Sequence, residues 1–155
     1  MSRLMSVAFT EQAVVERRKT VTRRKGWWKD KNGRRIIQPG DHLTLCRKVM
    51  GRRPGEPLVR LAEVEVVGIL RQPLGRLLRS WRAGAGMTCA SAMCGWVATD
   101  CEHWRAYETL EMEAEGFPGL ATERFVQDYF ADAQHVFPDD YVTRIEWRYL
   151  DGADA

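Results

Sequence analysis

The chain has 155 residues, of which 45% are hydrophobic and 29% charged, and its formal net charge is +3. This composition is typical of one globular domain with a core, since domains of this length bury about two-thirds of their unfolded surface. No run approaches the roughly 18 apolar residues that span a bilayer, and the N-terminal residues lack the apolar stretch of a secretion signal. We therefore expect a cytoplasmic protein with no membrane partner.

Taken in chain order, hydrophobic periodicity predicts alternating strands and short helices. The predicted strands cover 7–9, 20–24, 42–49, 58–70 and 141–150. The predicted helices cover 11–17, 74–81, 104–115 and 122–130. The clearest strand is 58–70, in which Val64 and Val66 share one face and Glu65 lies on the other.

These elements predict one domain, 1–155, interrupted by a Gly-, Ala- and Ser-rich segment at about 80–105. We interpret that segment as an irregular insertion, because it shows no clear periodicity. Five or six strands interleaved with two to four short helices favour an α+β fold built on a small β-barrel.

Basic charge is concentrated between Arg17 and Arg35, whereas 102–140 is mostly acidic. Such a basic face suits phosphate groups, and two tryptophans within the run could stack on bases. The candidate nucleic-acid-binding residues are Arg18, Lys19, Arg23, Arg24, Lys25, Trp27 and Trp28. A solvated basic surface without a ligand is the alternative.

Five short motifs occur in an order typical of one protein family. They are Arg18-Lys19-Thr20-Val21-Thr22-Arg23-Arg24, Gln38-Pro39-Gly40-Asp41, Glu115-Gly116-Phe117-Pro118, Glu123-Arg124-Phe125 and Val142-Thr143-Arg144-Ile145-Glu146. In these motifs the chain resembles the ASCH family of the PUA-like superfamily, in a subgroup common in bacteriophages and prophages. The resemblance covers nearly all of the chain except 80–105. It implies a β-barrel with a cleft, RNA or nucleotide recognition and, for a phage protein, the host cytoplasm.

One bacterial branch of that family is a small amidohydrolase that removes the acyl group from acetylated cytidine. Its Lys, its Thr three residues later and its downstream Glu match Lys19, Thr22 and Glu115. A threonine hydroxyl is a weak nucleophile without an adjacent base. A lysine acts as that base only where burial or neighbouring cations lower its pKa from about 10.4. Strand alternation would place Lys19 and Thr22 on opposite faces, so a shared site requires a bend between them.

Three functions remain open on these residues. The first is binding of RNA or single-stranded nucleic acid, in which Lys19 and Arg24 hold phosphates and Glu115 forms a structural ion pair. The second is hydrolysis of a modified nucleoside, a reaction that needs no cofactor. The third is an interaction protein that contacts a host partner through the insertion and the acidic helices.

Four potential metal ligands lie within fifteen residues: Cys89, Cys94, Cys101 and His103. Four nitrogen or sulfur ligands suffice for structural zinc, but this spacing lacks the tight paired turn of common zinc knuckles. Free thiols in cytoplasmic proteins are also usually inert. We therefore expect no metal and keep these four residues as zinc candidates. Cys46 is predicted to lie in the core.

Overall fold

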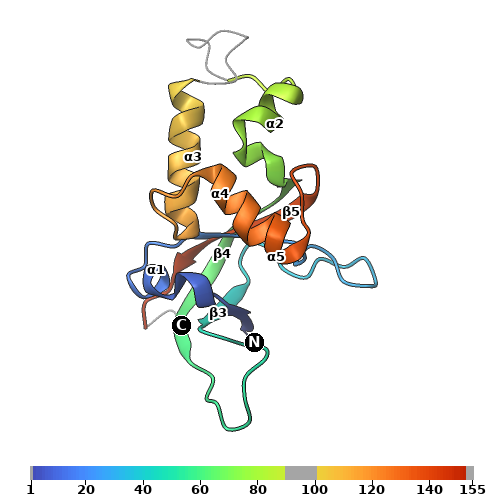
Figure 1. Ribbon diagram of the computed structural model, residues 1–155. Helices are drawn as coiled ribbons and strands as arrows, with labels where there is room; N and C mark the ends of the chain where they lie inside the picture. The colour runs from blue at the N-terminus through green and yellow to red at the C-terminus, as the bar shows by residue number, and fades with distance from the viewer. Residues whose placement is uncertain (1, 90–100, 153–155) are drawn as a thin grey trace.

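The computed structural model describes residues 2–89 and 101–152, and all elements named here belong to those two ranges. In them, one mixed sheet carries five strands in the order β1-β3-β4-β5-β2 (Figure 1). The strands are β1 (Arg3–Ser6), β2 (Val21–Arg24), β3 (His42–Cys46), β4 (Arg60–Pro73) and β5 (Tyr141–Tyr149). The β1–β3 pair is parallel and the other pairs are antiparallel. The α+β fold class predicted from the sequence is confirmed.

The sheet curls into a half-barrel, and β1 and β2 are its two edge strands. A side chain connects these edges: the Arg24 guanidinium on β2 donates a hydrogen bond to the carbonyl of Ser6 on β1. An arginine side chain therefore joins the two edges of the half-barrel at this point, where β1 and β2 do not pair through their backbones.

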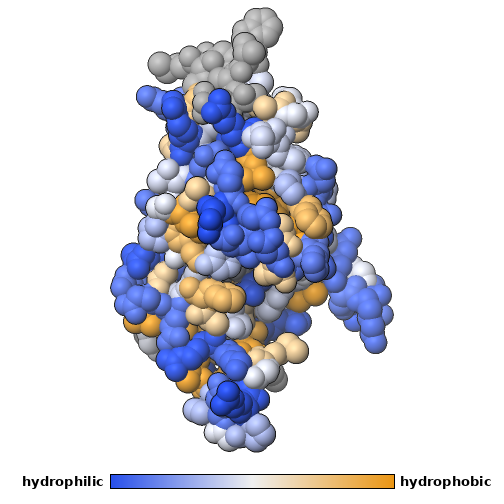
Figure 2. Space-filling model, viewed as in Figure 1, coloured by the Kyte–Doolittle hydropathy of each residue, from blue (hydrophilic) through white to orange (hydrophobic). Residues whose placement is uncertain are grey.

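Helices cover the sheet and extend beyond it. They are η1 (Ala8–Thr10), α1 (Glu11–Val15), η2 (Leu74–Leu77), α2 (Arg79–Gly84), α3 (Glu102–Glu115), α4 (Thr122–Val126), η3 (Gln127–Ala131) and α5 (Asp132–Gln134). Figure 1 shows α2 and α3 side by side and pointing away from the sheet, with α4 and α5 across their base. In the same view apolar residues gather near the middle of the surface, among hydrophilic ones (Figure 2). None of the described helices combines the length and the apolar composition needed to cross a membrane.

The strand predicted at 7–9 is wrong. The first strand lies at Arg3–Ser6, and the chain then enters η1, where Phe9 is 83% exposed. The residues after β1 therefore form a helical turn in which Phe9 is exposed, and the position of β1 is set by its parallel pairing with β3.

The predicted insertion is helical at both ends, in α2 and α3, and its residues 90–100 lie outside the described residues.

Two groups of buried side chains form the core. One packs the sheet against α1 and includes Val14, Leu43 and Trp147, and the other packs the helices and includes Phe125 and Phe130. Cys46 is fully buried on β3, which confirms its predicted place in the core. The cavity described next lies between the two groups.

Candidate active site

Lys19 lies in the turn between α1 and β2. Arg17 has a left-handed backbone (φ 57°), and the amides of Arg18 and Lys19 both donate to the carbonyl of Ala13. Because β2 begins at Val21, Lys19 is outside the strand, and strand alternation does not separate its side chain from Thr22. Both side chains line the same cavity. The bend that the sequence required is the turn before β2.

The backbone of Lys19 is held by the last strand. The indole Nε1 of Trp147 donates to the Lys19 carbonyl at 3.1 Å, and the hydroxyl of Tyr149 donates to it at 2.6 Å. Both donors belong to β5. The position of Lys19 is therefore fixed independently of its own side chain.

Glu115 is the last residue of α3 and faces Lys19. The Lys19 Nζ donates to the Glu115 carbonyl at 2.5 Å and lies 3.4 Å from Oε2. Gly116 then ends the helix with φ 92°, and a Cβ there would lie 3.1 Å from side-chain atoms of Thr10 and Ala13. A glycine is required here because the conformation is left-handed and α1 packs closely against the end of α3.

Arg23 connects Glu115 to a second carboxylate. Its Nη1 is 2.9 Å from Glu115 Oε1, and its Nη2 pairs with Glu111. Arg144, which lies opposite Arg23 in the β2–β5 register, also pairs with Glu111, at 2.8 Å. Burial opposes ionisation of Glu111, but hydrogen bonds from Arg144 and Arg23 outweigh it and hold the pKa of this carboxyl below its usual value. Two carboxylates and three cations thus form one largely buried network, which Arg144 extends to the more exposed Glu146.

The surroundings of Lys19 favour the neutral form of its amine, compared with a lysine exposed to water. Only 3% of the residue is exposed. Burial lowers the pKa of Lys19 to about 8; Glu115 opposes this shift, while Arg24 and Arg23 add to it. A lysine with such a pKa can accept a proton near neutral pH.

The cavity beside Lys19 has a polar wall and an aromatic wall. Its volume is about 170 Å³, comparable with the engineered cavity of about 150 Å³ that holds benzene. The polar wall contains Lys19, Thr22, Arg23, Arg24 and Glu115. The aromatic wall contains Phe9, Phe117, Phe125, Tyr129 and Phe130. This arrangement suits one small flat molecule with polar substituents.

The aromatic wall comes from elements that are distant in the sequence. The Phe9 and Tyr129 rings are 5.7 Å apart at 72°, and Phe117 is 4.6 Å from Tyr129. Phe125, Tyr129 and Phe130 fall within the helix predicted at 122–130, and nothing in the sequence connected that helix with Lys19. Nothing local in the sequence indicates that η1 and η3 meet.

Two arginines in the polar wall have unused donors. The Nε atoms of Arg23 and Arg24 are buried and have no hydrogen-bond partner within residues 2–89 and 101–152. A buried donor without a partner costs about 1–3 kcal/mol. A polar ligand atom at the Arg24 Nε would remove that cost.

The seven predicted nucleic-acid-binding residues lie in two different environments. Lys19, Arg23 and Arg24 face the cavity, whereas Arg18 and Lys25 are exposed. Trp27 packs against the core group of the sheet, and the Trp28 ring lies 3.5 Å from the Arg35 guanidinium. The cations therefore divide between the buried site and exposed positions before and after β2.

Glu111 and Arg144 are members of the site that sequence reasoning missed. A signal was present, because Glu111 and Glu115 are four residues apart and thus share one face of α3. Their partners, Arg23 and Arg144, are neighbours on adjacent strands. The strand register brings Arg23 and Arg144 together opposite the two carboxylates, and this register cannot be read from the sequence.

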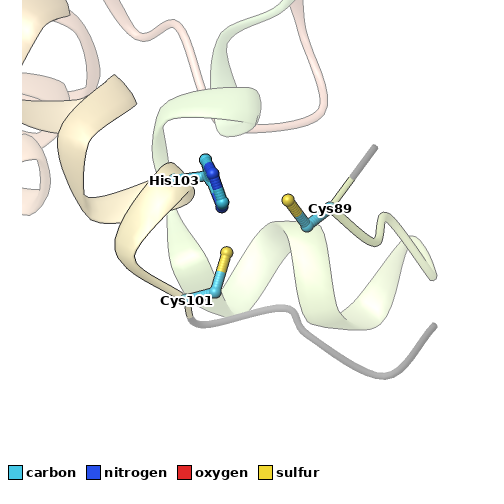
Figure 3. A group of neighbouring side chains, drawn as sticks. All are labelled: Cys89, Cys101 and His103. Atoms are coloured by element: carbon cyan, nitrogen blue, oxygen red, sulfur yellow. The ribbon is translucent and has the colours of Figure 1, made fainter. Parts of the chain in front are cut away.

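Three of the four zinc candidates lie together away from this cavity. Figure 3 shows Cys89, Cys101 and His103 pointing toward one another, and their ligand atoms all lie within 4.8 Å of one another. Cys94, the fourth candidate, lies outside the described residues.

No protein-family model and no curated protein matches the chain. The solved structures that are similar to it include the following two. A crystal structure of a DUF984 protein from Enterococcus faecalis V583 has 13% identity and a TM-score of 0.48, with 97% of this chain and 81% of that chain covered. An ASCH domain from Lactobacillus crispatus JV V101 has 10% identity and a TM-score of 0.42, with 96% and 79% covered. Neither likeness assigns this chain to a family, and the bacteriophage-type subgroup stays a prediction.

Proposed function

We propose that the cavity binds a modified nucleoside and hydrolyses an acyl amide on its base, with acetylated cytidine as the representative substrate. The observation that carries this proposal is the convergence of Lys19, Thr22 and Glu115 on one cavity. Lys19 is buried there, with its pKa lowered to about 8. Structural ion pairs also shift pKa values, but they do not require an adjoining cavity with an aromatic wall.

In the proposed reaction, neutral Lys19 takes the proton of the Thr22 hydroxyl as its oxygen attacks the acyl carbon. The C–N bond then breaks, and the Lys19 ammonium returns the proton to the leaving amine of the base. Water hydrolyses the acyl-threonine ester and restores the hydroxyl, so the products are an amine and a carboxylic acid. Glu115 orients the Lys19 amine through the contacts described above.

The described residues contain no hydrogen bond between Lys19 and Thr22, since the Lys19 amine contacts Glu115 instead. Catalytic hydrogen bonds are often long before substrate binds. The donor for the developing oxyanion in this scheme is the Arg24 Nε, which is buried and has no hydrogen-bond partner in the part of the chain that the structure describes.

The size of the cavity favours a nucleoside over an oligonucleotide. A volume of about 170 Å³ accommodates one base, and the exposed Phe9 ring offers a stacking surface at its rim. A chain of nucleotides would need several phosphate contacts. Of the three basic residues that line the cavity, however, Lys19 and Arg23 already pair with Glu115, and Arg24 donates to the Ser6 carbonyl.

The test is incubation of the full chain with acetylated cytidine, followed by chromatography of the released cytidine and acetate. Lys19→Met should lower the rate by about 10²–10⁴-fold, the usual contribution of a general base. Lys25→Met, at an exposed lysine close by in the sequence, should leave the rate unchanged. Equal rates for the two variants, or no hydrolysis of any acylated cytidine, would contradict the proposal.

A second candidate function is binding of RNA or single-stranded nucleic acid. The observation that favours it is the exposed loop between β2 and β3, in which Lys25, Lys29, Lys31 and Arg34 are all exposed. The stacked Trp28 and Arg35 add an aromatic surface to this loop. The two functions are compatible, because the loop lies outside the cavity lining. The interaction-protein hypothesis stays a prediction.

A further inference from the structure

We propose that Cys89, Cys101 and His103 form a zinc site at the outer end of the α2–α3 pair. The sequence alone led us to expect no metal, because the spacing of the ligands is irregular. The structure changes this expectation, since it brings two sulfur atoms and an imidazole nitrogen within 4.8 Å of one another (Figure 3). This site is separate from the cavity and does not depend on the proposed hydrolysis.

Two ligands are positioned by the start of α3. Cys101 is the N-cap residue, with an extended backbone, and its carbonyl accepts the amide of Arg105 at 3.0 Å. His103 follows in the first turn of the helix. A Cys-x-His sequence at a helix start therefore directs a thiol and an imidazole to the same place.

The third ligand is positioned by the end of α2. The helix ends at Gly84, and the Met87 amide donates back to the Arg82 carbonyl at 2.9 Å, around Gly86 with φ 68°. This turn sends the chain toward α3, where Cys89 meets the other two ligands. No disulfide joins Cys89 to Cys101.

The two helices are held together without a metal. Arg82 is 1% exposed, its Nη2 pairs with Glu108 at 2.5 Å, and its guanidinium lies 4.4 Å from the Trp104 ring. These contacts set the distance between the ends of α2 and α3. The ligand atoms can therefore converge before an ion binds, which lowers the entropy lost on binding.

The separation of the ligand atoms is near that required around a tetrahedral ion, for which these residues would supply three of the four ligands. Zinc binds sulfur at about 2.3 Å and nitrogen at about 2.0–2.1 Å, so tetrahedral ligand atoms lie roughly 3.5–3.8 Å apart. The observed upper limit of 4.8 Å is about an ångström longer. Thiolate and imidazole ligands also favour zinc over magnesium or calcium, which prefer oxygen.

The outer end of the two helices has a small core that a metal would strengthen. In the ranges 83–89 and 101–110, Trp104 is the one side chain that is buried. Cys89 and His103 border a cavity of about 320 Å³ that Trp104 also lines. Regions with little apolar burial often rely on a structural metal, because metal binding adds directly to folding free energy.

The test is the metal content and the spectrum of the full chain. Protein purified under reducing conditions from zinc-supplemented medium should contain one zinc per chain by mass spectrometry of the metal. Replacement with Co²⁺ should give the absorption of a tetrahedral ion with thiolate charge-transfer bands. Removing the metal with a chelator should lower the thermal midpoint, and added Zn²⁺ should restore it.

Matched histidine variants locate the site. His103→Ala should lose the zinc and the charge-transfer bands, or weaken zinc binding at least tenfold, whereas His42→Ala, at an exposed histidine on β3, should keep both. Circular dichroism checks that both variants fold. Wild-type protein without zinc, equal zinc content in the two variants, or a mass lower by two hydrogens from a Cys89–Cys101 disulfide would each overturn the proposal.

Discussion

The Nζ atom of Lys19 lies 3.4 Å from Oε2 of Glu115, although the two residues are 96 positions apart in the sequence. Both side chains are 3% exposed. Burial of such a pair is expensive, and well-packed apolar residues are often at least as stable in its place. Buried ionisable groups beside a cavity are typical of reactive sites. The contact therefore supports a chemical role more than a purely structural one.

The rate of the proposed hydrolysis should increase with pH and level off above about pH 8. Below its pKa of about 8, Lys19 is mostly protonated and cannot accept the Thr22 proton. The measurement is kcat/KM for acetylated cytidine as a function of pH, corrected for uncatalysed hydrolysis. A rate that falls or stays constant across this range would show that a neutral lysine is not required.

Glu115→Gln should move that midpoint to lower pH. The negative charge of Glu115 raises the pKa of Lys19, so its removal lets burial and the neighbouring arginines lower the pKa further. The same pH series on the variant measures the shift. Glu65→Gln, at a surface partner of Arg148, is the control and should leave the midpoint in place. A midpoint that stays near 8 in Glu115→Gln would argue against Lys19 as the titrating group.

Thr22→Val should abolish hydrolysis while leaving the fold intact, because valine has nearly the same shape but no hydroxyl. Thr22→Ser should retain part of the activity. We expect a loss of at least about 10²-fold for Val, in the range of losses for nucleophile removal. Thr20→Val is the matched control, since Thr20 does not line the cavity. Activity in Thr22→Val near the wild-type rate would instead indicate direct attack by water.

Arg23→Leu should destabilise the protein by about 3–5 kcal/mol, since it leaves the buried carboxylates Glu111 and Glu115 without a shared partner. Urea unfolding monitored by tryptophan fluorescence measures this loss. Arg47→Leu breaks an exposed pair with Glu11 and should cost about 0–1 kcal/mol. Similar losses for the two variants would mean that the buried network adds little stability.

Binding of single-stranded RNA, if the loop between β2 and β3 provides it, should weaken steeply with salt. Each phosphate contact contributes about −0.7 to the slope of log K against log salt concentration. Replacing Lys29, Lys31 and Arg34 by Gln should therefore reduce the slope by about 2. Fluorescence anisotropy of a labelled oligonucleotide measures it, with Arg52→Gln/Arg53→Gln in another exposed basic loop as the control. An unchanged slope in the triple variant would exclude this loop as the binding surface.

The sequence predicted the main strands because their alternation is local. The strand predicted at 20–24 is observed at Val21–Arg24, and the one predicted at 141–150 is observed at Tyr141–Tyr149. The first strand was misplaced because a four-residue parallel edge strand has little pattern of its own. Its position depends on pairing with β3, which is more than thirty residues later in the chain.

The site was only partly predictable, because it too depends on contacts between segments that are distant in the sequence. Lys19, Thr22 and Glu115 were named by resemblance, while alternation argued against a shared site for Lys19 and Thr22. That objection assumed that Lys19 belongs to the strand, whereas the left-handed backbone at Arg17 turns the chain just before it. The Phe9–Tyr129 contact and the meeting of Cys89 with His103 depend on how helices pack, which no local pattern encodes.

The hydrogen bonds from Trp147 and Tyr149 to the Lys19 carbonyl have a consequence for biosynthesis. During translation Lys19 is synthesised early, whereas β5 is synthesised after every other strand described here. The nascent chain therefore carries the proposed base long before Trp147 and Tyr149 are present to hold it. Until β5 pairs with β2 and β4, the cavity lacks a fixed lysine. Activity would thus begin when synthesis has passed β5, and truncated translation products would remain inert.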